Sequence, residues 1–275
     1  MNLKLNLLSL FLCIGVVAYA SQPINPNAIS VGSAINLAAK NRMLTQRVGK
    51  AYLMKAINVD VEQAQKEIDK SIVLFDENLR LLSDFAPSRD IRDEIDRVKM
   101  QWGIYKNLIL EPVSKDNALQ IISGNTDMFN FSNGIVFILI KHAMTLPDAN
   151  KDPLLTNKNL TEKLNIASLC RSLPQRMALY YLAYYGGYTA DLKVFKEAFD
   201  EYGQNLTTLL TYEGNTQQIE DALSEVYTPW KILRDDYTDI TNKKITPAHI
   251  YELTDQLLSA ADRVMILYAE QLDLP

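Results

Sequence analysis

The chain has 275 residues, with 33 acidic against 28 basic side chains and a net charge of −5. Proteins that bind nucleic acid usually carry a strongly basic face, so no nucleic-acid partner is expected. The two histidines, His142 and His249, lie far apart and without carboxylate spacing, which argues against a metal site. No cofactor is expected either.

The first twenty residues have the pattern of an export signal. Lys4 gives a positive start, 5–17 are almost wholly apolar, and the Ala-Tyr-Ala of 18–20 matches a small-x-small cleavage site. The apolar run is shorter than the roughly 20 residues that a membrane span needs. We predict a signal peptide over 1–20 and a mature chain in the periplasm. The alternative is an uncleaved N-terminal anchor.

Apolar residues recur at helical spacing along the rest of the chain, and no segment has the alternation of a strand. The predicted helices cover 30–56, 61–85, 89–110, 116–145, 161–185, 190–212, 216–241 and 246–272. Short connections favour antiparallel neighbours. A stretch with two prolines and several charges, 146–158, separates the first four helices from the last four. We therefore predict an all-α fold of two tandem antiparallel four-helix bundles, 21–147 and 148–275.

The two predicted bundles begin with the same polar pattern. At an offset of 129 residues, Asn36, Arg42, Gln46 and Arg47 align with Asn165, Arg171, Gln175 and Arg176. Further on, Trp102 aligns with Trp230 after a loop difference of one residue. Apolar positions would coincide in any two bundles, but polar residues in one register have no packing reason to do so. The pattern predicts an internal duplication.

Residues four apart share one face of a helix, so Arg42 and Gln46 project together beside small residues such as Ala39. Arg171 does likewise beside Ser168. An arginine flanked by small side chains can present its fork of N–H donors in a narrow crevice, which suits a planar oxyanion. The alternative for each arginine is a surface salt bridge. For Arg47 and for Arg176 the two interpretations stay equally open.

The segment INLAAKNRMLTQR, 35–47, resembles the signature of the PilJ-type sensory domain, and 164–176 resembles it more loosely. That domain is the periplasmic part of pilus-linked chemotaxis transducers. It is related to the nitrate- and nitrite-sensing domains of Nar-type histidine kinases. The resemblance implies an antiparallel four-helix bundle, with an anion held where two copies of the first helix meet.

Carried over by this resemblance, Arg42 and Arg171 take the role of the ligand-binding arginines. Ala39 and Ser168 stand where a small residue brings its backbone close to the ligand. The supporting residues are Asn36, Gln46, Arg47, Asn165, Gln175 and Arg176.

The second copy departs from the pattern at two positions. Pro174 replaces Thr45 inside the predicted helix, which removes a backbone donor and is expected to kink the helix. Cys170, which would be the only cysteine of the mature chain, replaces Asn41. Either the second copy forms a distinct pocket, or it has become a structural partner of the first.

The leading hypothesis is a periplasmic sensor that binds nitrate or a similar small oxyanion. Because the chain carries no output module, its state would pass to a membrane partner such as a histidine kinase or a chemoreceptor. One chain would supply the two copies that relatives bring together as a dimer. If the guanidinium groups of Arg42 and Arg171 pointed apart, a homodimer or two separate sites would be favoured.

The alternative is a helical adaptor or structural protein of the cell envelope that binds no ligand, and it predicts that carboxylates engage both arginines. An enzyme is not expected, since no Ser/His/Asp set, Cys/His set or phosphate loop is present. Cys170 lies beside Arg171, which could lower its pKa, but no histidine accompanies it.

Overall fold

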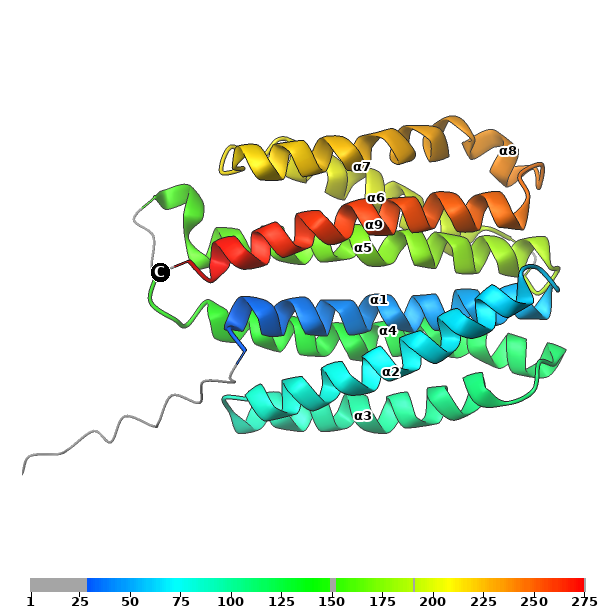
Figure 1. The fold of residues 1–275 in the computed structure, drawn as a ribbon, viewed down its shortest axis with the longest axis horizontal. Coiled ribbons are helices and arrows are strands. Elements are labelled where there is room, and N and C mark those ends of the chain that lie inside the picture. Colours follow the sequence, from blue (N-terminus) through cyan, green and yellow to red (C-terminus); the bar gives the residue numbers. More distant parts are fainter. Residues whose placement is uncertain (1–28, 149–151, 190, 275) are drawn as a thin grey trace, which may run out of the picture.

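The computed structural model describes residues 29–148, 152–189 and 191–274, and all regular structure in them is helical (Figure 1). The predicted signal peptide, 1–20, lies outside the described residues. None of the described helices combines the length and apolar character that crossing a membrane requires.

The first four helices begin and end within about two residues of the predicted positions. They are α1 (Val31–Ala56), α2 (Val61–Phe85), α3 (Arg89–Leu110) and α4 (Lys115–Ala143). Serine side chains cap three of the starts: Ser30, Ser88 and Ser114 each accept a backbone N–H of the first turn. These caps satisfy donors that the helix itself leaves without partners, which fixes where the helices start.

The second half repeats this order, with one interruption. It contains the short 3₁₀ helix η1 (Pro153–Leu155), α5 (Asn157–Tyr185), α6 (Lys193–Leu210), α7 (Gln217–Asp235), α8 (Tyr237–Thr241) and α9 (Pro247–Leu272). The prediction of one helix over 216–241 is wrong. Asp236 ends α7, where its N–H closes the last turn on Ile232 and its carboxylate lies 3.1 Å from Nε2 of His249.

Two other details of the second half differ from the prediction. Helix α6 starts at Lys193 rather than at 190, directly after Leu192, whose backbone is not helical. Helix α5 starts earlier than predicted, because Thr156 caps it by accepting the N–H of Asn159. It then continues through Pro174 to Tyr185 as one helix.

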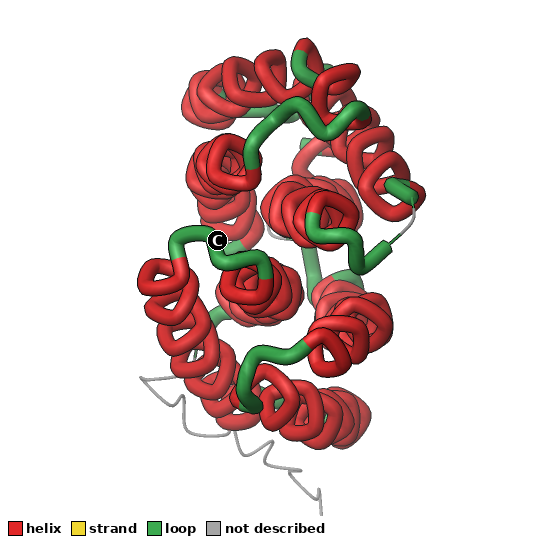
Figure 2. The backbone as a smooth tube through the Cα atoms, turned by 90° about the vertical axis from the view of Figure 1, so that its right-hand side faces the viewer, coloured by secondary structure: helices red, strands yellow, loops and turns green. Residues whose placement is uncertain are grey.

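The helices form stacked layers, with α1, α4, α5 and α9 in the middle (Figures 1 and 2). Helices α2 and α3 cover one side of this middle group, and α6 and α7 cover the other. The predicted all-α bundle is confirmed. The two halves are not separate bodies, however, because α1 packs directly on α5 and one hydrophobic core runs through both.

Helices α1 and α5 run side by side and come very close. A Cβ atom at Gly49 would lie 2.5 Å from the side chain of Leu179 and 3.1 Å from the hydroxyl of Tyr105. Glycine at this position therefore permits the approach. At the ends of the two helices, the hydroxyl of Tyr188 donates to the carbonyl of Ala56 over 3.3 Å.

A buried group of charges also joins the halves. Glu67 on α2 accepts from Nε of Arg47 over 2.6 Å and lies 3.1 Å from Nζ of Lys50. It also accepts from the hydroxyl of Tyr251 on α9. Lys50 makes a second ion pair of 2.8 Å with Asp255 on α9. Burial alone would raise the pKa of Asp255, but the neighbouring Lys50 lowers it.

We predict that Glu67→Gln lowers the free energy of unfolding by about 3–5 kcal/mol, because it leaves buried cations without their carboxylate. Urea unfolding followed by circular dichroism measures this. Glu62→Gln on the same helix is the matched control, since Glu62 forms an exposed pair with Lys66. It should change stability by less than about 0.5 kcal/mol. Equal effects of the two substitutions would contradict a stabilising role for the buried group.

Candidate functional site

Arg42 and Arg171 lie at the contact between α1 and α5, and each is only 1 % exposed. Their charges are close enough to act on each other, because the guanidinium of Arg171 contributes to lowering the pKa of Arg42. The structure thus brings the two predicted ligand arginines together within one chain. Both side chains cross this contact: Arg42 reaches Ser168 on α5, and Arg171 reaches Asn36 on α1.

Arg42 reaches two neutral polar side chains. Its Nη1 donates to Oδ1 of Asn133 on α4, and its Nη2 donates to Oγ of Ser168 on α5. The Ser168 hydroxyl in turn donates to the carbonyl oxygen of Asn165 over 2.7 Å. Arg42 therefore connects the last helix of its own half with the first helix of the other half.

Arg171 makes the corresponding connections from α5, to the first helix of the other half and to the last helix of its own. Its Nη1 donates to Oδ1 of Asn36 on α1 over 2.9 Å and to Oδ1 of Asp262 on α9 over 2.7 Å. Its Nη2 donates to the backbone oxygen of Asn36 over 3.1 Å. Each arginine thus crosses the α1–α5 contact and is also held by the last helix of its own half.

The two arginines differ in the charge of these partners. Asn133 follows Arg42 by 91 residues, and Asp262 follows Arg171 by the same number, so the two partners occupy equivalent positions. Asp262 forms an ion pair with Arg171. The amide of Asn133 carries no charge, and no carboxylate of the described residues lies within 4.0 Å of Arg42. Arg42 is a buried cation without a directly paired anion.

The pKa of Arg42 reflects this environment. Burial lowers it to about 9, and repulsion from Arg171 acts in the same direction. Attraction from Glu201 and Cys170 opposes the change without cancelling it. Burial also lowers the pKa of Arg171, but there the adjacent Asp262 counteracts it. The charged form of Arg42 is therefore held at a cost that a nearby anion would relieve.

Arg42 also keeps one donor free. Its buried Nε has no hydrogen-bond partner among the described residues, and the same holds for Nε of Arg171. A buried donor without an acceptor costs about 1–3 kcal/mol. The ring of Phe129 on α4 lies 5.6 Å from Cζ of Arg42. The surroundings of Arg42 thus offer a positive charge, a free N–H donor and an aromatic ring.

The predicted supporting residues divide into two groups around this pair. Arg176 donates to Oε1 of Gln46 over 3.2 Å and to Oγ1 of Thr126 over 2.9 Å, and its Cζ lies 5.2 Å from the Phe129 ring. It belongs to the Arg42 side of the α1–α5 contact. Arg47 instead pairs with a carboxylate of the buried charge group described above.

The remaining supporting residues also have definite places. Gln175 donates to Asp255 over 3.0 Å and so joins that charge group. Asn36 holds Arg171, but Oδ1 of its counterpart Asn165 has no partner in the described part of the chain. Ala39 is fully buried in the core. Ser168 meets Arg42 through its hydroxyl, a contact that its alanine counterpart could not make.

Cys170, at the position that corresponds to Asn41, leaves a nearby polar group without a partner among the described side chains. In the first half, Asn78 donates to Asn41 over 2.8 Å. Cys170 replaces Asn41, and Nδ2 of Asn205, the counterpart of Asn78, has no partner among the described side chains. Burial raises the pKa of the Cys170 thiol, with the attraction of Arg42 too weak to reverse this. The expectation that Arg171 could lower that pKa is wrong.

Sequence reasoning missed Asn133 and Asp262. Asn133 lies on α4 and Asp262 on α9, outside the polar pattern that the first helices of the two halves share. Their common distance of 91 residues from an arginine is a signal that the sequence carries. The described residues contain no group of three or more histidine, cysteine, aspartate or glutamate side chains placed to bind a metal ion.

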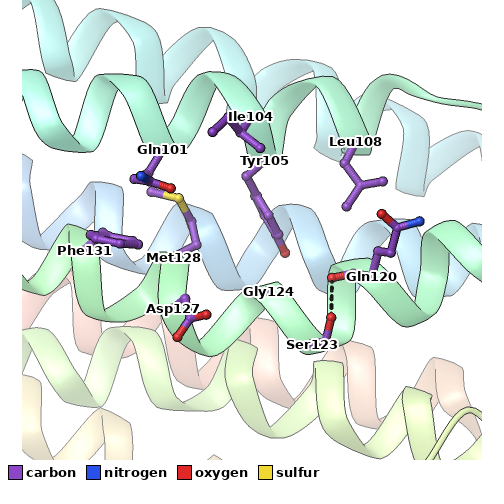
Figure 3. A pocket seen from close by; sticks show the side chains of 10 residues that line it. All are labelled: Gln101, Ile104, Tyr105, Leu108, Gln120, Ser123, Gly124, Asp127, Met128 and Phe131. Carbon is purple, nitrogen blue, oxygen red and sulfur yellow. Dashed lines mark hydrogen bonds between the residues drawn. The ribbon is translucent and has the colours of Figure 1, made fainter.

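Surface grooves lie apart from Arg42. One groove of about 280 Å³ lies between α3 and α4, and Figure 3 shows Tyr105, Met128 and Phe131 among the side chains that line it. Another, of about 290 Å³, is lined by residues of α1, α2 and α9 and reaches Asp262. Solvent therefore reaches the Asp262 side of the ion pair between Asp262 and Arg171.

The low pKa of Arg42 predicts a pH dependence of stability. Below pH 9 the arginine is charged in both the folded and the unfolded chain, so folding bears the full cost of burying it. Above about pH 9 the folded protein releases the proton first, which reduces the cost. We predict that Arg42→Met raises the free energy of unfolding most at neutral pH, and that its advantage over the wild type shrinks as the pH rises through 9.

Urea unfolding of the two proteins between about pH 7 and pH 10 measures this difference. Asn133→Asp is the control, because a carboxylate beside Arg42 would keep the guanidinium charged and stabilise it. In that background the effect of Arg42→Met should not shrink over this range. A pH-independent difference in the wild-type background would contradict the strained state of Arg42.

Comparison with known proteins finds one family that matches the part of the chain containing Arg42. Residues 27–125 match the family PilJ, described as the N-terminal part of the type IV pili methyl-accepting chemotaxis transducer. No curated protein and no solved structure matches the chain. The matched region contains α1 with Arg42, α2, α3 and the first part of α4. Residues 27–125 are therefore similar to a PilJ-type sensory domain.

Proposed function

We propose that this protein is a periplasmic sensor that binds one small oxyanion at Arg42 and passes its state to a membrane partner. Nitrate is the first candidate, with nitrite and other small oxyanions of similar size behind it. The partner would be a histidine kinase or a chemoreceptor. The PilJ match supports a sensory role and a membrane-associated partner. The identity of the anion comes from the resemblance to nitrate-sensing relatives.

The observation that carries the proposal is the unpaired charge of Arg42. A cation that is 1 % exposed and held only by the neutral partners Asn133 and Ser168 is costly unless an anion joins it. A protein that used this arginine only for structure would be expected to pair it, as Asp262 pairs Arg171. The adaptor alternative required carboxylates at both arginines, and one of the two lacks a paired carboxylate.

We further infer that the two halves derive from a duplication and act together as one unit. Arg42 and Arg171 sit 129 residues apart on the first helices of the two halves, and each contacts the other half's first helix. In this interpretation the second half has become the partner of the first. Arg171, with its charge compensated, holds α1 in place through Asn36. The chain then has one anion site, on the Arg42 side.

A route for the signal follows from the same contacts. An anion beside Arg42 would compete for the donors that now hold Ser168 on α5, and so alter how α1 and α5 are joined. Hydrogen bonds join the start of α1 to the end of α9. Asp273 accepts one from the N–H of Gly32 over 2.9 Å and one from the hydroxyl of Ser30. A shift of α1 would therefore reach this end of the bundle, where we place the contact with the membrane partner.

Isothermal titration calorimetry with nitrate, nitrite, sulfate and chloride tests the proposal. We predict saturable binding of nitrate or nitrite with one site per chain, and its loss in Arg42→Met. Asn133→Asp should also abolish binding while making the protein more stable without any anion, because the new carboxylate takes the anion's place. Anion at about 100 times its dissociation constant should stabilise the wild type by about 2.7 kcal/mol.

Arg80→Met is the matched control. Arg80 is an exposed arginine on α2 that pairs with Glu77 and Asp84, far from the α1–α5 contact. This variant should bind the anion like the wild type. If no anion binds, or if Arg42→Met and Asn133→Asp bind as well as the wild type, the proposed site is wrong.

A further inference from the structure

The arginine pair and Asp262 form a cluster with a defined net charge. Arg42 and Arg171 each contribute one positive charge, and Asp262 contributes one negative charge at 2.7 Å from Nη1 of Arg171. Asn133, which stands at the equivalent place beside Arg42, contributes none. The cluster therefore carries a single net positive charge, in a part of the core where both guanidinium groups are 1 % exposed.

Two further charges near Arg42, those of Glu201 and Arg176, are of opposite sign and leave this count unchanged. Glu201 on α6 attracts Arg42 at a distance, but it is exposed and forms no ion pair with it within 4.0 Å. Arg47 is paired within the buried charge group, by Glu67. Arg176 is the next cation, and it is held by neutral groups and the ring of Phe129. It is also partly exposed, so water screens its charge more than that of Arg42.

We propose that Asp262 sets the charge selectivity of this site, so that it accepts an anion of one negative charge and rejects a dianion of the same shape. The inference rests on the proposed function, because it concerns the anion that Arg42 binds. One negative charge brings the cluster to neutrality. A second would remain uncompensated inside the core, because the charge of Arg171 is already compensated by Asp262.

The position of Asp262 fits this role. Its side chain is 42 % exposed, so it contacts water while it pairs with Arg171. It also lines the groove between α1, α2 and α9. A purely structural role would make Asp262 important for stability but not for the choice between anions of equal shape.

Chlorate and sulfite provide the test, because both are pyramids of three oxygens and they differ by one negative charge. We would titrate each into the purified wild-type protein and into Asp262→Asn, at a pH where sulfite is a dianion. The wild type should prefer chlorate by at least about tenfold. In Asp262→Asn the ratio should shift towards sulfite by at least about tenfold, since the cluster then carries two uncompensated positive charges. Asp262→Glu, which restores the charge, should restore the wild-type preference.

The outcomes separate this inference from the proposed function. If chlorate and sulfite bind the wild type but their ratio is the same in Asp262→Asn, the selectivity role of Asp262 is overturned and the anion site stands. If Asp262→Asn shifts the ratio and Asp262→Glu does not restore it, the charge of Asp262 is not the cause and the inference is also overturned. If neither these anions nor nitrate binds the wild type, both the site and its selectivity are overturned.

Discussion

The guanidinium group of Arg42, buried between two helices without a paired carboxylate, is the feature on which the rest of this account depends. Placing a charged arginine at 1 % exposure is costly, and its pKa of about 9 shows that the surrounding protein does not fully compensate it. The equivalent arginine, Arg171, is compensated by Asp262. One chain thus holds the same arrangement in a paired and an unpaired form, and we place the proposed anion site at the unpaired one.

The arrangement of the helices keeps the contact between α1 and α5 away from water. Because α1 and α5 lie in the middle of the layered bundle, side chains that point between them are removed from water on all sides. Gly49 allows the two helices to come close, and the buried charges around Glu67 fix α1 and α2 to α9. The halves of the chain therefore share one core, and a change at Arg42 is felt on both sides of it.

Much of this could be predicted from the sequence because it depends on local patterns. Helical periodicity and residues such as Ser88 and Ser114 set the boundaries of the first four helices to within about two residues. The polar repeat predicts equivalent places for Arg42 and Arg171, and both lie at the α1–α5 contact. That an anion binds there is a proposal. Local patterns do not predict the break of α7 at Asp236. The contact that accompanies this break is made with His249, on another helix.

The charge difference between the halves could not be read from the first helices alone. It lies in Asn133 and Asp262, which meet their arginines only after the chain has folded back over 91 residues. Such contacts depend on how the last helix of each half packs on the first. The sequence signal for Asn133 and Asp262 is their equal distance of 91 residues from Arg42 and Arg171.

The most direct test of the central claim follows the Nε–H group of Arg42 by nuclear magnetic resonance during a titration with nitrate. Its signal can be assigned by its absence from Arg42→Met. We predict a saturable shift of this signal, with slower exchange of the proton with water, because the free Nε–H gains an acceptor. In Asn133→Asp the signal should not respond. An Arg42 signal that stays unchanged at saturating nitrate would contradict the account.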